Sequence, residues 1–449
     1  MKVLHTTHNM DMIHGSLGDK IIRFVLPLAV TGILQQMFNA ADVAVVGRFV
    51  GTQAMAAVGS NAPLIGLLVN LFIGVSIGAN VVVSHYMGQR NTEAVGRAAH
   101  TAVVTALVSG CIVCVTGELT AVPLLHLLGV PDDVFPLSLI YLRIYLGGMP
   151  VILLYNFEAA LFRSQGDTRT PLICLIASGV INVVLNLFFV LALGMSADGV
   201  ALATVISNLI SAGLMFFILL RTDMDIRIDV RRLSPHLKDL REMLRIGLPA
   251  GVQGMVFSVS NMAVQSAVNS LGSQVMAASS AAFNVEILAY YVLNAYGQAC
   301  TTFTGQNYGA GKIDRCKRTL FICILQNTVA TACIAGLLFL FRRQALGLFN
   351  SDPQVILYGS VRMAFILSGE VVNGFNEIMS GSLRGYGHSL GPAMMTLIGV
   401  CGTRITWVLT IFRKFHSFSY LMACYPVSWI MTAIALIIYY RRMISRMRC

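Results

Sequence analysis

The chain has 449 residues, of which 56% are hydrophobic and only 11% are charged, with a formal net charge of +11. A soluble domain carries roughly 25% Asp, Glu, Lys and Arg, so a chain this poor in charge cannot cover a water-facing surface. The composition therefore excludes a soluble globular protein and predicts an all-α membrane protein. The ten cysteines lie mostly inside apolar segments and imply no disulfide framework.

Residues 1–20 are polar and contain no apolar core of the kind that marks a secretory signal. We expect a cytosolic N-terminal tail here. Its histidines, His5, His8 and His14, match no metal-ligand spacing, so we predict no bound metal.

Long uncharged runs follow this tail, and each exceeds the ~18 apolar residues that cross hydrocarbon as a helix. Thr170–Ala197 and Phe415–Tyr440 are two of them. Twelve transmembrane helices are predicted in two sets of six. In chain order they cover 21–47, 58–84, 93–117, 136–162, 170–193, 198–221, 243–270, 276–304, 318–341, 358–384, 391–412 and 418–440.

These helices divide the chain into two predicted lobes, 21–221 and 243–441. A charged segment, 222–242, joins them as an inter-lobe loop on the cytosolic side, and a basic cytosolic tail, 442–449, follows the last helix. The charged loop is long enough to let the lobes rock against each other.

The basic residues concentrate in the loops on the side of the N-terminus. Seven Lys and Arg lie between Arg221 and Arg245, and four lie between Arg441 and Arg448. Because cytosolic loops carry an excess of Lys and Arg, both termini are expected in the cytosol of a cell whose inner membrane holds the protein. The positive charge is thus a topology signal, and we expect no nucleic-acid partner.

The two halves repeat each other. Leu26-Pro27 recurs as Leu248-Pro249, 222 residues later, and Gly51–Ala57 recurs as Gly272–Ala278, 221 residues later. The second offset also pairs Arg97 with Arg318, Arg163 with Arg384, Gly166 with Gly387 and Pro171 with Pro392. Duplicated halves of six helices enter the membrane in the same sense, which predicts a pseudo-twofold axis along the membrane normal.

Polar side chains inside a membrane are costly, so each is a functional candidate. Gln35, Asn39 and Asp42 lie on one face of the first helix, and Asn182 and Asn186 lie one turn apart in the fifth. One carboxylate with several amide oxygens suits Na⁺. The carboxylate alone suits a proton, because apolar surroundings favour a neutral acid. These five residues form the predicted ion-coupling site, unless Asp42 is simply solvated among the lipid headgroups.

The second half keeps an amide but loses the acid, because Asn261 matches Asn39 while Val264 takes the place of Asp42. Glu286, Glu370 and Arg404 also lie inside predicted helices. They are candidates either for secondary coupling or for helix pairing, with Arg404 neutralising one of the two acids.

Two further acids lie near the predicted cytosolic face and are expected to form local ion pairs. Glu377 is seven residues before Arg384, and Glu158 is five residues before Arg163. A structural role is therefore expected for both.

Aromatic, Met and amide side chains suit a cavity for large amphiphilic molecules, because flexible thioethers adapt to varied ligands. Most such residues in a membrane bundle face lipid or pack between helices. The candidates for a substrate cavity are Met37, Tyr155, Phe257, Asn261, Gln265 and Tyr290.

Several short segments resemble motifs of the multidrug and toxic compound extrusion (MATE) family, in the same order and within the same six-plus-six repeat. They are Pro27 with Asn39–Asp42 and Gly47–Gly51, then Gly88–Asn91, Arg163–Thr168, Gly199–Thr204 and Gly305–Gly311. The resemblance implies a V-shaped pair of six-helix lobes and export of cationic or amphiphilic compounds by antiport with H⁺ or Na⁺. No His-Glu-x-x-His pattern lies inside a predicted span, so we expect no enzyme. We also expect no cofactor, with H⁺ or Na⁺ as the transported coupling ion, and a monomer in the lipid bilayer.

Within the family, Asp42 matches the acid of the first helix. The chain has Asn186 where members often have Asp in the fifth helix, and the seventh helix lacks the Glu typical of the NorM-like branch. The sequence therefore resembles a DinF-like or related branch more closely. A lipid-linked oligosaccharide flippase of the same superfamily is the main alternative function, and a channel is a second.

Overall fold

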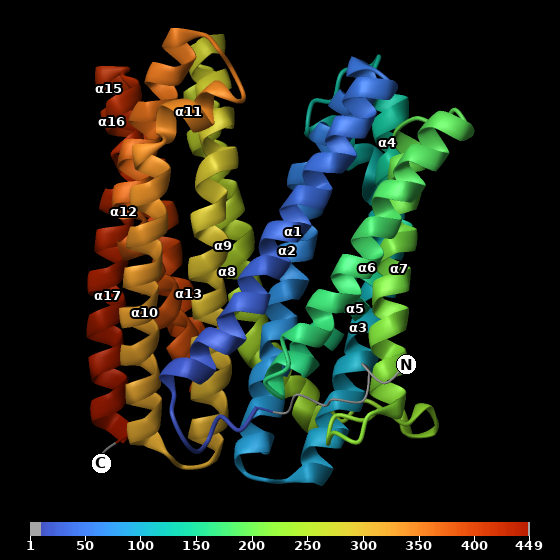
Figure 1. The fold of residues 1–449 in the computed structure, drawn as a ribbon, viewed down its shortest axis with the longest axis vertical. Helices are drawn as coiled ribbons and strands as arrows, with labels where there is room; N and C mark the ends of the chain where they lie inside the picture. Colours follow the sequence, from blue (N-terminus) through green and yellow to red (C-terminus); the bar gives the residue numbers. More distant parts are fainter. Residues whose placement is uncertain (1–9, 448–449) are drawn as a thin grey trace. The chain divides into compact units, whose positions relative to one another are not determined.

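The computed structural model describes residues 10–447, and its ordered elements are all helices (Figure 1). The chain divides into two compact units. Val30–Leu248 form the body of the first, and Met12–Ala29 together with the chain from Pro249 onward form the second.

The first unit is built around one central helix, α5, which packs against α2, α3 and α7. Its helices are α1 (Gly18–Phe49, from Val30 onward), α2 (Thr52–Gly88), α3 (Thr92–Leu127), α4 (Phe135–Gly147), α5 (Met149–Ser164), α6 (Arg169–Leu187), η2 (Phe188–Ala192), α7 (Ala197–Arg221) and η3 (Val230–Arg232).

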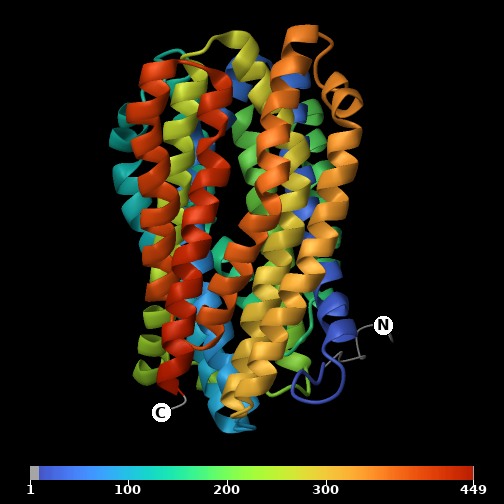
Figure 2. The same ribbon diagram turned by 90° about the vertical axis from the view of Figure 1, so that its left-hand side faces the viewer.

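The second unit has the same plan around α12, which packs against α9, α10 and α17 (Figure 2). Its helices are α8 (Leu237–Asn269, from Pro249 onward), α9 (Ser273–Gly309), α10 (Ile313–Leu340), α11 (Arg342–Gly347), α12 (Pro353–Gly385), α13 (Leu390–Thr396), η4 (Leu397–Gly402), α14 (Thr403–Trp407), η5 (Val408–Phe412), α15 (Arg413–Phe415), α16 (Phe418–Met422) and α17 (Cys424–Met447).

Within residues 10–447, ten helical segments are long and apolar enough to cross a membrane. An eleventh span results if α4 and α5, which meet at 48°, are counted together. The remaining predicted span is α8, whose Gln, Ser and Asn residues make it less apolar than the others. The predicted all-helical membrane fold is confirmed, and the V-shaped arrangement of its lobes stays a prediction of the family resemblance.

The units exchange the first turns of two equivalent helices. Residues 12–29 belong to the second unit, where Phe24 packs edge-on against Phe303 with ring centroids 5.6 Å apart. The first turns of α8 belong to the first unit, where the backbone at Gly247 lies directly against Val75. The predicted lobe boundaries did not include this exchange, which occurs next to Pro27 in α1 and at Pro249 in α8, where proline removes a helical hydrogen bond.

The segment before α1, predicted as a cytosolic tail, is part of the second unit from Met12 onward. The buried Met12 accepts hydrogen bonds through its carbonyl from Asn307 and Arg315, at 3.1 and 3.3 Å. His5 and His8 lie outside the described residues. Within residues 10–447, no group of three or more His, Cys, Asp or Glu is placed to hold a metal ion.

The segment between α7 and α8, predicted as a charged inter-lobe loop, belongs to the first unit. Its side chains alternate between buried and exposed, so that Met224, Ile226 and Ile228 join the apolar core while Asp223 and Asp225 face outward. This alternation fixes the segment to one unit along most of its length.

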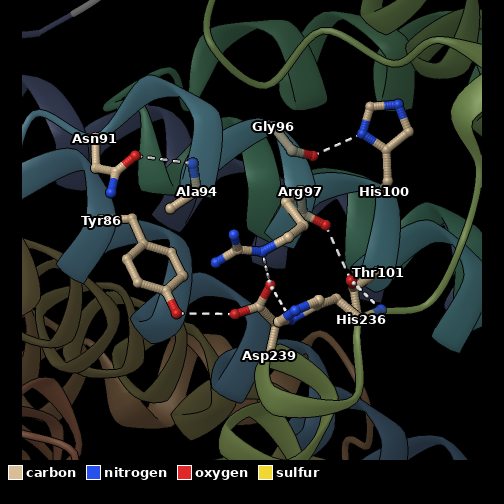
Figure 3. A network of polar contacts seen from close by, with 9 residues as sticks. All are labelled: Tyr86, Asn91, Ala94, Gly96, Arg97, His100, Thr101, His236 and Asp239. Carbon is tan, nitrogen blue, oxygen red and sulfur yellow. Dashed lines mark hydrogen bonds and ion pairs between the residues drawn. The ribbon is translucent and has the colours of Figure 1, made fainter.

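A polar network holds the end of this segment and the start of α8 (Figure 3). The fully buried carboxylate of Asp239 accepts hydrogen bonds from Arg97 and Tyr86, each at 2.8 Å, and lies 3.2 Å from the ring of His236. Nearby, the His100 ring accepts a bond from the backbone N–H of Asp229 through Nε2, at 2.9 Å. Since Asp239 belongs to α8, the network anchors the exchanged helix end to α2 and α3.

We predict that Asp239→Ala destabilises the protein by about 2 kcal/mol, because hydrogen bonds to a charged group contribute about that much. Thermal unfolding in detergent measures the change. Asp223→Ala, at an exposed position of the segment before α8, is the matched control and should leave the melting temperature unchanged. Equal effects of the two substitutions would contradict the anchoring role.

Candidate functional site

Asp42 lies at the centre of a small polar cluster inside the first unit. Its side chain is only 7% exposed, and it comes from the second half of α1. Asn186 of α6 donates to one carboxylate oxygen through Nδ2, at 2.5 Å, and Thr204 of α7 donates to the other through Oγ1, at 3.2 Å. Three helices thus contribute to one site, and each carboxylate oxygen has one neutral partner.

Two local features prepare this cluster. Asn182 and Asn186 lie one turn apart on α6, and the amide of Asn186 also donates to Asn182, at 3.3 Å. The π-helical segment η2 follows directly at Phe188, and such wide turns occur often at functional sites. The predicted residues Asp42, Asn182 and Asn186 therefore come together.

Thr204 is the partner that sequence reasoning missed, although it closes the Gly199–Thr204 motif. Its hydroxyl lies 3.2 Å from Asp42 and 3.0 Å from the carbonyl of Val200, one turn earlier in α7. A hydroxyl has only one proton to donate. Thr204 can therefore turn from the charged carboxylate to its own helix when the carboxyl group becomes neutral.

The other two predicted members of the site point elsewhere. Gln35 and Asn39 are exposed on α1, and Gln35 interacts with the hydroxyl of Tyr155. Among the predicted cavity residues of this unit, Met37 is exposed and Tyr155 is buried in the core around α5. The predicted polar face of the first helix therefore divides into a buried acid and exposed amides.

The second unit holds a buried ion pair that differs from the predicted one. Glu286 of α9 pairs with Arg362 of α12, with a shortest N–O distance of 2.5 Å, and both side chains are buried. Arg362 also donates to Ser279, at 3.3 Å. The prediction that Arg404 would neutralise Glu286 is wrong, because Arg362 is the partner of Glu286. For Glu370 the structure shows no ion pair with Arg404 among the described residues, and that part stays a prediction.

Arg404 is fully buried and is held by neutral groups. It donates to Asn261 at 2.8 Å and to Ser428 at 3.2 Å, and its guanidinium carbon lies 4.2 Å from the centre of the Tyr425 ring. Phe257 packs on it as well, at 5.3 Å. Two predicted cavity residues, Phe257 and Asn261, therefore enclose an arginine inside the unit.

The remaining candidates of this unit form local contacts. Gln265 donates to Asn269 of the same helix, at 2.9 Å, and Tyr290 packs edge-on against Tyr291. The buried Glu370 accepts a bond from Asn373 at 3.2 Å, and it takes part in no ion pair among the described residues.

The two predicted local ion pairs have different outcomes. Glu377 and Arg384 lie 3.2 Å apart, which confirms the first. The second is wrong, because Glu158 is fully buried in the core around α5 and neither of its carboxylate oxygens has a hydrogen-bond partner among the described residues. Positions five residues apart on an α-helix differ by about 140°, so Arg163 faces another direction.

The family model described as MatE matches this chain twice, over residues 27–188 and 249–408. The two matches begin 222 residues apart, the distance from Pro27 to Pro249, and they confirm the internal duplication. The chain belongs to the MATE family. This is a family of transporters and not of enzymes, so the protein is a multi-pass membrane transporter.

Named relatives cover most of this MATE transporter. The probable multidrug resistance protein YoeA of Bacillus subtilis is 28% identical over 429 residues, which are 93% of this chain and 92% of that protein. The probable multidrug resistance protein NorM of Thermotoga maritima is 24% identical over 88% of this chain and 86% of its own length. Because a relative named NorM matches at this level of identity, the relatives do not separate the NorM-like and DinF-like branches. The DinF-like branch therefore stays a prediction.

The fold of this MATE transporter matches a solved structure over nearly its whole length. That structure is described as the outward-facing conformation of a multidrug resistance MATE family transporter of the MOP superfamily. The TM-score is 0.91 at 21% sequence identity, and 99% of each chain is covered.

We predict that Glu286→Met destabilises this MATE transporter by about 3–5 kcal/mol, because it leaves the charge of Arg362 buried without its partner. The double substitution Glu286→Met with Arg362→Met should recover most of the loss, since two apolar side chains fill the same space. Thermal unfolding of the purified proteins measures both effects. A double variant less stable than either single variant would contradict the pairing.

Glu158 leads to the opposite expectation. Glu158→Met should stabilise the transporter by about 1–3 kcal/mol, because it removes a buried polar group that has no partner. Glu158→Gln is the matched control, since the amide stays polar at the same position and should give a smaller gain. A lower melting temperature of the Met variant would show that the carboxyl group has a stabilising partner.

Proposed function

We propose that this protein is a secondary active efflux transporter that exports cationic or amphiphilic compounds in exchange for H⁺ or Na⁺. The observation that carries the proposal is the buried carboxylate of Asp42, held by Asn186 and Thr204 on separate helices. A single ionisable group inside an otherwise neutral cluster is a natural ion switch, because its charge changes the balance of every contact around it.

In the proposed cycle, the charged Asp42 accepts from both neighbours and favours a cationic substrate in the same lobe. Binding of a proton or Na⁺ neutralises the carboxylate. The hydrogen bond from Thr204 then loses most of its strength, since bonds to charged acceptors are about twice as strong as neutral ones. The changed contacts between α1, α6 and α7 supply the differential free energy that shifts the transporter between its two access states.

The cluster offers chemistry for either ion. Asp42, Asn182, Asn186 and Thr204 carry side-chain oxygens, the hard ligands that alkali cations prefer. One of these oxygens, Oδ1 of Asn186, has no hydrogen-bond partner in the described structure. A proton needs only the carboxylate. Transport under separate H⁺ and Na⁺ gradients decides between the two ions.

The substrate class rests on the names of relatives and on the family. YoeA and NorM are named as probable multidrug resistance proteins, and their whole lengths are nearly covered by this chain. We further propose that the protein acts as a monomer in the inner cell membrane with both termini in the cytosol. The concentration of Lys and Arg in the loops on that side supports this orientation.

We predict that Asp42→Asn abolishes ion-driven efflux, because the amide cannot change its charge. Dye export from proteoliposomes is measured under an inward H⁺ gradient and, separately, an inward Na⁺ gradient. Asp132→Asn, an exposed acid between α3 and α4, is the control for loss of a carboxylate and should transport at the wild-type rate. Wild-type export by the Asp42 variant would disprove the proposed coupling role.

A further inference from the structure

The end of α17 forms one wall of a basic pocket in the second unit. The pocket has a volume of about 340 Å³, within the range of small-molecule sites. It is lined by His388, Tyr439, Arg442, Met443 and Arg446. None of these residues belongs to the Asp42 cluster or to the ion pairs described above.

The pocket follows from helical spacing. Tyr439, Arg442, Met443 and Arg446 occupy positions i, i+3, i+4 and i+7, which lie on one face of a helix. The opposite wall is the turn between α12 and α13. Tyr439 fixes the distance between the walls, because its ring lies directly against the backbone of Gly391, where any side chain would collide with it.

The position along α17 places this pocket at the membrane surface. The uncharged run of this last span ends at Tyr440, and Arg441 and Arg442 follow immediately. Tyrosines at the end of a span mark the boundary between hydrocarbon and headgroups. A ligand in the pocket would therefore have its polar part at headgroup level and its apolar part beside the span.

The positive charge of the pocket favours an anionic ligand. Arg442 and Arg446 are exposed, and the described ion pairs include neither of them. No Asp or Glu occurs in the turn from Gly385 to Pro392 or in α17. Two guanidinium groups one turn apart, with no Asp or Glu in either wall of the pocket, match the oxygens of a phosphodiester. Tyr439 and Met443 add an apolar floor for the glycerol and the start of an acyl chain.

We propose that this pocket binds the headgroup of an anionic phospholipid, with Arg442 and Arg446 on its phosphate. The site goes beyond the proposed transport function, since it uses different residues and a ligand that is not transported. Clusters of Lys and Arg directly next to a span are typical of sites for anionic lipids, and here the cluster is shaped into a pocket.

The test uses the full-length protein in a neutral detergent, where no charged membrane surface contributes. The protein is titrated with short-chain dioctanoyl phosphatidylglycerol, and the shift of the melting temperature gives an apparent affinity. We expect saturable stabilisation by this lipid and none by dioctanoyl phosphatidylcholine. Arg442→Ala and Arg446→Ala should each weaken the apparent affinity about fivefold, from roughly 1 kcal/mol per arginine.

Arg441→Ala is the matched control, because Arg441 is exposed on the same helix but does not line the pocket. It should leave the affinity within a factor of two. An equal loss in Arg441→Ala would overturn the proposal in favour of diffuse charge attraction. Equal stabilisation by phosphatidylcholine would also overturn it. A full shift of the melting temperature by inorganic phosphate at the same concentration would overturn the proposal as well, because the site would then select free phosphate.

Discussion

A charged side chain inside hydrocarbon is stable only when other protein groups replace the water that it has lost. Three buried side chains meet this constraint in three different ways. Asp42 is held by two neutral donors, Glu286 is paired with Arg362, and Arg404 is held by an amide, a hydroxyl and aromatic rings. Each of the three arrangements joins side chains from different helices.

The three solutions also differ in what they allow. An ion pair such as Glu286 with Arg362 is neutral as a unit, and breaking it leaves one buried charge, so it is suited to fixing α9 against α12. An arginine does not lose its proton in proteins, so Arg404 is a permanent cation. Asp42 and Glu370 both combine burial, a neutral hydrogen-bond partner and an acid that can become neutral, but only Asp42 is held by side chains from two other helices. The chemistry of the side chains thus separates the permanent or paired charges from the acids whose charge can change.

Much of the fold followed from the sequence, because hydrophobic length alone predicts membrane helices and the repeat relates one half to the other. The prediction that Asp42, Asn182 and Asn186 meet also followed from helical spacing and intramembrane polarity. The partners of the charges were harder to predict. Arg362 lies 76 positions from Glu286 in the chain, and only packing of α12 on α9 brings the two together. The predicted ion pair of Glu158 with Arg163 is wrong for the reverse reason. The two residues are close in sequence, but the helical turn directs their side chains to different sides.

The exchange of helix ends also lay beyond sequence reasoning. Hydropathy locates a helix but does not tell which bundle its first turns join. That choice depends on contacts such as Phe24 with Phe303 and Asp239 with Arg97. In both helices the change from one unit to the other occurs near an equivalent proline, Pro27 in α1 and Pro249 in α8. Both halves of the duplication therefore show the same exchange.

The two halves differ in charge at equivalent positions of their polar centres. Asp42 and Asn39 correspond to Val264 and Asn261 at an offset of 222. In the fifth and eleventh spans the offset between the halves is 221 at Pro171 and Pro392. The wider turn of the π-helical segment η4 accommodates one additional residue before Arg404, so the offset at Arg404 becomes 222. This shift makes Arg404 the counterpart of Asn182. Asp42, Asn39 and Asn182 of the first unit thus correspond to Val264, Asn261 and Arg404 of the second.

The contacts agree with this correspondence. Arg404 bonds to Asn261 and stacks on Tyr425, and Tyr425 lies 221 positions after Thr204, the partner of Asp42. The same three elements therefore build a polar centre in each unit, with opposite charge. A permanent cation cannot take up a proton or Na⁺. Of these two corresponding centres, only the one around Asp42 therefore contains an acid whose charge can change.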